Sequence, residues 1–85
     1  MELKDLAKIA DSFCKSKGWI QDWKLGGCYL HLESSELIES LRGKRGNPAE
    51  EASDVLTALL SMTEYYGIDT DEIIESFIQK KINLT

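Results

Sequence analysis

The chain has 85 residues and a mass of 9.6 kDa, too few to build two independent hydrophobic cores, so residues 1–85 are expected to form one domain. Hydrophobic residues make up 42% of the chain and charged residues 29%, a composition that excludes a disordered or collagen-like protein. The formal net charge of -5 has the wrong sign for a surface that grips a nucleic-acid backbone. We therefore expect a folded, acidic domain that does not bind nucleic acid directly.

The length of the chain and its cysteines predict its oligomeric state and its cellular compartment. A helical domain of this length often completes its core by self-association, so we expect a homo-oligomer, either a dimer or a tetramer. No apolar run reaches the roughly 18 residues of a membrane span, and none follows a basic start as in a signal peptide, so neither segment is expected. Cys14 and Cys28 are isolated thiols, which is typical of reduced cysteines. These features predict a cytoplasmic protein that does not contact a membrane.

The first half of the chain predicts two helices joined by a loop. From residue 3 to residue 17, apolar side chains recur at three- and four-residue intervals, and Gly18 follows. Residues 19–27 contain both tryptophans and a Gly-Gly pair, so they are predicted as a loop. A second helix is expected to begin near residue 28 or 29 and to end at Gly43, because glycine readily closes a last helical turn.

The second half of the chain predicts two more helices. Asn47 followed by Pro48 indicates a helix start, since Asn caps free N–H groups and Pro has no N–H to leave unsatisfied. This third helix is expected to end at Gly67, and Asp69 or Thr70 is expected to cap a fourth helix. No strand is predicted, so the fold class is all-α, a four-helix bundle completed by oligomerisation.

Two pairs of carboxylates are the most informative feature of the sequence. Glu33 and Glu36 lie three residues apart on the second helix, and Glu51 and Asp54 lie three residues apart on the third. Glu33 and Glu51 are about 70–80° from the core direction of their helices, and Glu36 and Asp54 about 130–140°, so both pairs are displaced toward the same side. Two helices with this arrangement are suited to clamp a cation between them.

A divalent cation explains why like charges are placed side by side. Such pairs repel by about 0.2–0.5 kcal/mol on an isolated helix. Oxygen ligands without a nearby histidine or cysteine at ligand spacing favour Mg²⁺ or Mn²⁺ over zinc. The alternative is a chance spacing of solvated acids, since residues 33–75 hold eleven acidic and only three basic side chains.

The order and spacing of these motifs resemble the all-α nucleoside triphosphate pyrophosphohydrolases of the MazG type. Five short segments spread over residues 17–83 carry the resemblance. They are KGW at 17–19, ESSEL at 33–37, EASDVL at 51–56, YGID at 66–69 and KKIN at 80–83. Two positions depart from the family pattern: Leu32 stands where the family often has a Glu, and the chain ends at Thr85 where the family often has an Arg.

The resemblance implies an activity and a metal. The expected reaction is hydrolysis of a nucleoside or deoxynucleoside triphosphate to a monophosphate and pyrophosphate, with Mg²⁺ as the cofactor and Mn²⁺ as a substitute. Glu33, Glu36, Glu51 and Asp54 are the expected metal ligands. One carboxylate would orient the attacking water, with Glu36 and Glu51 as the candidates.

Three further residues are candidates for binding the substrate. Lys80 and Asn83 share a face of the fourth helix and are expected to meet phosphate oxygens, and Trp19 is expected to stack on a base. The alternatives are a solvated helix end for the first two residues and a core or interface position for the tryptophan.

The single histidine and the basic residues between the second and third helices are not predicted to be catalytic. His31 has no Ser or Cys partner at a useful spacing and so predicts no nucleophilic triad, and Lys44 and Arg45 are interpreted as solvated loop residues. The absence of a P-loop or GxGxxG motif gives no support to kinase or dehydrogenase functions. The alternative function is a catalytically inactive helical dimerisation or nucleotide-sensing module of the same fold, which the two departures from the family pattern favour.

Overall fold

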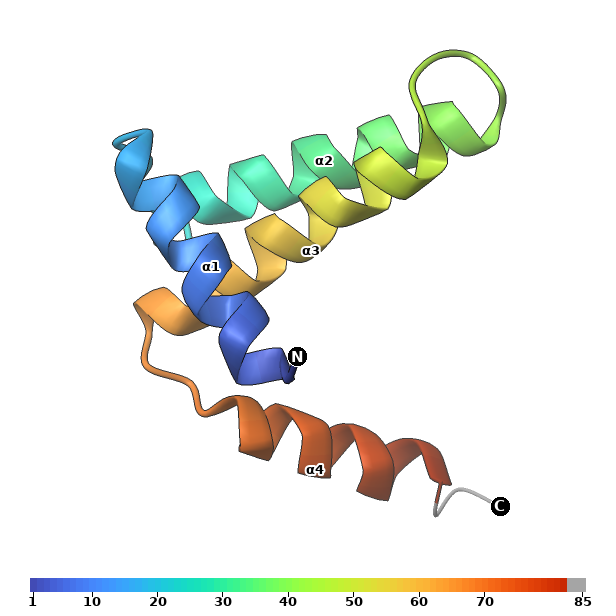
Figure 1. Ribbon diagram of the computed structural model, residues 1–85. Coiled ribbons are helices and arrows are strands. Elements are labelled where there is room, and N and C mark those ends of the chain that lie inside the picture. Colours follow the sequence, from blue (N-terminus) through green and yellow to red (C-terminus); the bar gives the residue numbers. More distant parts are fainter. Residues whose placement is uncertain (83–85) are drawn as a thin grey trace.

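The computed structural model describes residues 1–82, and all regular structure within them is helical (Figure 1). The helices are α1 (Leu3–Ser16), α2 (Leu25–Leu41), α3 (Pro48–Tyr65) and α4 (Thr70–Ile82). The predicted all-α fold with four helices is confirmed for this part of the chain, which contains no strand. None of these helices combines the length and apolar character needed to cross a membrane.

Local sequence signals set most of the helix ends. α1 and α2 each end shortly before a glycine with a positive φ, Gly18 at 71° and Gly43 at 73°, as the sequence predicted. At the start of α3, the side-chain oxygen of Asn47 accepts hydrogen bonds from the backbone N–H groups of Ala49 at 2.9 Å and Glu50 at 3.3 Å. The predicted cap is therefore present and satisfies two N–H groups that lack helical partners.

The start of α2 differs from the prediction. The helix begins at Leu25 rather than near residue 28, so the Gly26-Gly27 pair lies inside the helix and not in the preceding loop. The Asp22 carboxylate accepts a hydrogen bond from the Leu25 N–H at 2.7 Å and so holds the first turn. A Cβ atom at Gly26 would lie 2.8 Å from the carbonyl carbon of Gln21. Gly26 is thus required by the close approach of the loop to the helix, not by a turn.

The four helices form an open arrangement rather than a closed bundle. α2 and α3 run antiparallel as a hairpin, α1 packs across α3, and α4 contacts α1 alone among the helices (Figure 1). The core lies where α1 crosses α3 and contains Ala7, Ala10 and Leu60, each at most 5% exposed. The small alanine side chains allow the two helices to approach closely. A single chain therefore leaves the arrangement open, and its completion to a bundle by oligomerisation stays a prediction.

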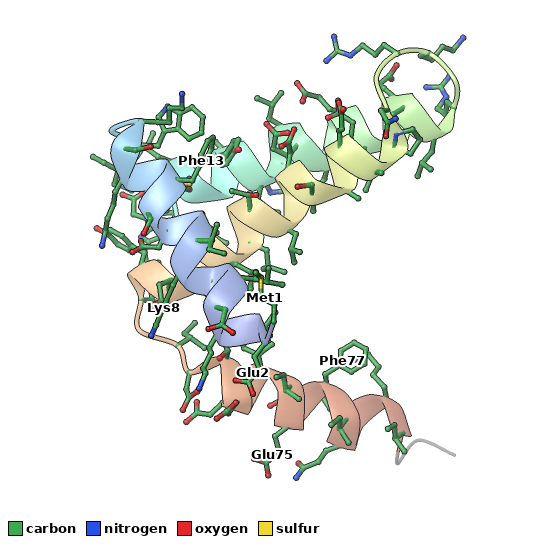
Figure 2. All side chains as sticks on the ribbon, viewed as in Figure 1. Met1, Glu2, Lys8, Phe13, Glu75 and Phe77 are labelled. Carbon is green, nitrogen blue, oxygen red and sulfur yellow. The ribbon has the colours of Figure 1, made fainter. Side chains whose placement is uncertain are left out.

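Several large apolar side chains on α3 and α4 are exposed. Leu56 and Leu59 on α3, and Ile74, Phe77 and Ile78 on α4, are between 39% and 62% exposed. Figure 2 shows Phe77 directed toward the side of α4 on which α1 and α3 lie, and Glu75 directed the opposite way. The apolar side of α4 thus faces the rest of the chain, but its contact with α1 leaves Phe77 and Ile78 largely exposed.

Candidate metal centre

The α2–α3 hairpin brings three of the four predicted ligands together. One carboxylate oxygen from each of Glu33, Glu36 and Glu51 lies within 4.8 Å of the other two. We call these three residues the carboxylate cluster. Asp54 lies one turn further along α3, outside the cluster, but close enough for its charge to raise the pKa values of both Glu33 and Glu51. The antiparallel packing of α2 on α3 therefore converts two sequence motifs into one site.

Two oxygens of the carboxylate cluster are buried without a hydrogen-bond donor. The Glu33 residue is 7% exposed, and neither its Oε2 atom nor the Oε2 atom of Glu51 has a partner within residues 1–82. Glu36 is half-buried and Asp54 is exposed, which follows the rotational phases expected from the sequence. An unpaired buried oxygen is unfavourable by a few kcal/mol, and a cation held between these side chains would remove this cost.

Electrostatic repulsion within the cluster also favours a cation. Burial raises the pKa of Glu33 from 4.5 to about 7, and the charges of Glu36 and Asp54, a hydrogen bond with Glu36 and the charge of Glu51 add to this rise. Burial and the charges of Glu36 and Asp54 also raise the pKa of Glu51, whereas Arg45 lowers it. The cluster holds more negative charge than its surroundings neutralise.

The spacing of the cluster fits a hard divalent ion. Mg²⁺ binds oxygen at about 2.0–2.1 Å, so ligands on opposite sides of the ion lie about 4.2 Å apart. The three carboxylate oxygens lie within 4.8 Å of one another, which is comparable with this span. Oxygen-only donors on rigid helices are also the set that Mg²⁺ and Mn²⁺ prefer.

A cavity of about 510 Å³ adjoins the carboxylate cluster. Its walls are mostly apolar and aromatic and come from the α1–α2 loop and from α2. The lining residues are Gly18, Trp19, Ile20, Gln21, Leu25, Tyr29, Leu32 and Glu33. Because Glu33 belongs to both the cavity and the cluster, a ligand in the cavity would touch the carboxylate cluster. Burial, followed by the charge of Glu33, raises the pKa of Tyr29 to about 12, so the phenol stays neutral there.

Trp19 occupies a fixed position on the cavity wall. Its ring centroid is 5.7 Å from that of Phe13 in an edge-to-face contact and 5.4 Å from that of Tyr29. The side chain nevertheless remains 46% exposed, so part of its surface is available to a ligand. Nearby, the Gln21 amide nitrogen donates to the Cys14 sulfur at 3.1 Å and holds the loop onto α1.

The loop between α2 and α3 contacts the cluster, which the sequence did not predict. The Arg45 guanidinium lies 3.3 Å from a carboxylate oxygen of Glu36, so Arg45 is not merely a solvated loop residue. A Cβ atom at Gly46 would lie 2.9 Å from a carboxylate oxygen of Glu51. The signal that points to this contact is a basic residue and a glycine in the connection between the two motif-bearing helices.

The structure does not bring the other predicted substrate-binding residues to the cluster. Lys80 lies on α4, which contacts neither α2 nor α3 within the chain. Asn83 lies outside the described residues. His31 is exposed on α2 and is not part of the cluster.

Comparison with known proteins assigns no function to this site. No protein-family model, no curated protein and no solved structure matches the chain. The chemistry of the site therefore follows from the carboxylate cluster, the adjoining cavity and the motif resemblance alone.

Proposed function

We propose that this chain is a Mg²⁺-dependent nucleoside triphosphate pyrophosphohydrolase of the MazG type. The observation that carries the proposal is the pair of buried carboxylate oxygens on Glu33 and Glu51, which lack donors among residues 1–82 and lie beside Glu36. Substrates would be nucleoside or deoxynucleoside triphosphates, and products a monophosphate and pyrophosphate. Cys14 and Cys28 are both free thiols, which fits a reducing compartment such as the cytoplasm.

Each carboxylate has a role in this proposal. Glu33, Glu36 and Glu51 would hold Mg²⁺ or Mn²⁺, with Asp54 at the edge of the site. The bound ion would neutralise charge on the phosphates and lower the pKa of a water molecule, so that no histidine base is needed. Glu36 and Glu51, which are less buried than Glu33, are the candidates for orienting that water.

The cavity would receive the nucleoside. A volume of about 510 Å³ lies in the range of small-molecule pockets, and aromatic walls suit a flat base. Trp19 and Tyr29 supply the aromatic surface, and Glu33 joins the cavity to the cluster. A nucleotide with its base in the cavity would thus place its phosphates next to the carboxylates.

Pyrophosphate release from a panel of ribo- and deoxynucleoside triphosphates, with Mg²⁺, Mn²⁺ or EDTA, tests the proposal. We expect metal-dependent release that Glu36→Gln and Asp54→Asn each reduce by about a hundredfold or more, with the helical circular dichroism unchanged. Glu39→Gln is the matched control, because Glu39 lies on α2 outside the cluster and pairs with Arg42. Wild-type protein that releases no pyrophosphate from any nucleotide would contradict the proposal.

A nucleotide-sensing module without turnover is the second candidate. The position of Lys80 favours the sensing function. Because α4 does not contact the α2–α3 hairpin, Lys80 of the same chain does not reach the phosphates of a nucleotide bound at the cluster, and few positive charges remain to bind them. Leu32, where the family often has a Glu, lines the cavity and adds no charge to the cluster. Metal-dependent nucleotide binding measured by calorimetry, without pyrophosphate release, would identify this function.

We also propose that a second copy of the chain covers the apolar face of α4. A folded monomer of 9.6 kDa is expected to expose roughly 5,100 Å², whereas this chain exposes 6197 Å². The excess of roughly 1,000 Å² is comparable to the 800 Å² per partner of a standard interface. The exposed side chains Ile74, Phe77 and Ile78 provide the apolar centre that such an interface needs.

Light scattering coupled to size-exclusion chromatography measures this association. We expect the wild type to be a dimer or tetramer and Phe77→Ser to shift it toward the monomer. Glu75→Ser, on the opposite side of α4, should leave the mass unchanged. A monomeric wild type at the highest concentration tested would contradict self-association.

A further inference from the structure

Arg45 is a basic residue that acts directly on the carboxylate cluster. Its guanidinium forms an ion pair with Glu36 at 3.3 Å, and its charge also acts on Glu51. The Arg45 side chain is 67% exposed, whereas that of Glu36 is 26% exposed, so the guanidinium lies at the mouth of the site between the carboxylates and the solvent. Arg45 thus occupies the position from which an anionic ligand would approach the cluster.

The backbone of the loop keeps Arg45 at this position. Gly46, with φ at 77°, lies so close to Glu51 that a Cβ atom would come within 2.9 Å of its carboxylate oxygen. The next residue, Asn47, is fixed by its hydrogen bonds to the first turn of α3. The loop is therefore tied to the same helix that supplies Glu51, which keeps the backbone of Arg45 next to the cluster.

We infer that Arg45 binds the phosphate groups of the substrate, and that it neutralises Glu36 when no divalent ion is bound. This role rests on the proposed function, because it requires an ion in the carboxylate cluster and phosphates above it. Once the ion supplies the positive charge that Glu36 needs, the guanidinium is free to form paired hydrogen bonds with phosphate oxygens. Its five N–H donors suit phosphate geometry better than the single ammonium group of a lysine.

The two parts of this role predict opposite effects of one substitution. Arg45→Gln removes a cation that competes with the metal, so the affinity for Mn²⁺ alone should rise by about twofold to fivefold. The same change removes charged hydrogen bonds to phosphate, so the affinity for inorganic pyrophosphate in the presence of Mn²⁺ should fall by about tenfold or more. A purely structural role of Arg45 would weaken both affinities together.

Isothermal titration calorimetry measures both affinities on the full chain without turnover. Arg42→Gln is the matched control, because it makes the same charge change at a residue that pairs with Glu39 outside the cluster. Arg45→Lys keeps the charge and should bind pyrophosphate with intermediate affinity. The expected result is tighter Mn²⁺ binding and weaker pyrophosphate binding for Arg45→Gln, with both affinities unchanged for Arg42→Gln.

The remaining outcomes overturn the inference and separate it from the proposed function. If the wild type binds Mn²⁺ but Arg45→Gln binds pyrophosphate as tightly as the wild type, Arg45 does not bind phosphate and the metal site stands. If Arg42→Gln loses as much pyrophosphate affinity as Arg45→Gln, the effect is one of net charge. If the wild type binds no Mn²⁺, the metal site itself is refuted together with the role of Arg45.

Discussion

Removing the negative charge of Glu33 should stabilise the ion-free protein at high pH. The pKa of Glu33 rises from 4.5 to about 7 on folding, so the folded state holds this proton more tightly than the unfolded state. The stability that the proton confers is fully present below pH 4.5 and is lost as the pH rises through 7. Glu33→Gln cannot ionise, so it should unfold with a higher free energy than the wild type at pH 8.5.

The size of the effect follows from the pKa change and the position of the side chain. At about 1.36 kcal/mol per pH unit, a rise from 4.5 to about 7 corresponds to about 3.4 kcal/mol. Solvent at the mouth of the cluster screens the interactions of Glu33 with its neighbours, so about 1–2 kcal/mol is the realistic expectation. In a domain of this size, this difference raises the melting temperature by about 5–10 °C.

Thermal unfolding followed by circular dichroism tests this prediction in EDTA at pH 4.5 and pH 8.5. Glu33→Gln should melt above the wild type at pH 8.5 and at the same temperature as the wild type at pH 4.5. Mg²⁺ at five times its Kd should then stabilise the wild type at pH 8.5 by about 1 kcal/mol and leave Glu33→Gln unchanged. Glu39→Gln, which changes the same side chain on the same helix outside the cluster, should show neither effect.

Two results would refute the reasoning. A Glu33→Gln protein less stable than the wild type at pH 8.5 in EDTA would mean that the ionised carboxylate has a stabilising partner. A wild-type melting temperature that is constant from pH 4.5 to pH 8.5 would mean that the cluster does not raise the pKa of Glu33.

Four substitutions test the backbone around the site. Gly46→Ala and Gly43→Ala each force alanine to a positive φ and should lower the free energy of unfolding in urea by about 1 kcal/mol. Only Gly46→Ala should also weaken Mn²⁺ binding, because its Cβ atom displaces Glu51. Equal Mn²⁺ affinities of the two variants would contradict the contact between Gly46 and Glu51. Asn47→Ala removes the cap of α3 and should lower the free energy of unfolding by about 1 kcal/mol, and an unchanged urea midpoint would show that the cap is dispensable. Gly26→Ala should lower the free energy of unfolding by about 2 kcal/mol or more, because the added Cβ atom meets the backbone of the preceding loop. This loss exceeds the gain from the better helix propensity of alanine. A Gly26→Ala protein that is more stable than the wild type would contradict the close contact.

Much of the site could be predicted because its spacing is a property of single helices. A three-residue step on a helix places Glu33 beside Glu36 and Glu51 beside Asp54 whatever the tertiary fold. The sequence also ordered these residues by depth, and the structure buries Glu33 more than Glu36 and leaves Asp54 exposed. The sequence could not predict that Asp54 stays outside the three-residue cluster, since this depends on how closely α2 and α3 approach.

The rest of the site depends on contacts between segments that no periodicity describes. The ion pair of Arg45 with Glu36 joins a loop to the helix before it. The separation of Lys80 from the cluster follows from the direction in which α4 leaves α3. A helical pattern shows which side chains share a face, but it contains no information about the distance between two helices.

The sequence by itself determined the number of helices, most of their ends and the two carboxylate pairs, because hydrogen bonds, caps and side-chain spacing within a helix are local. Only the tertiary structure decided that α2 begins at Leu25, that Gly26 serves a close contact, and that the apolar face of α4 is left exposed in a single chain. The physical reason is that burial and close packing depend on which surfaces meet, and this is settled by the whole chain and, in our proposal, by a second copy of it.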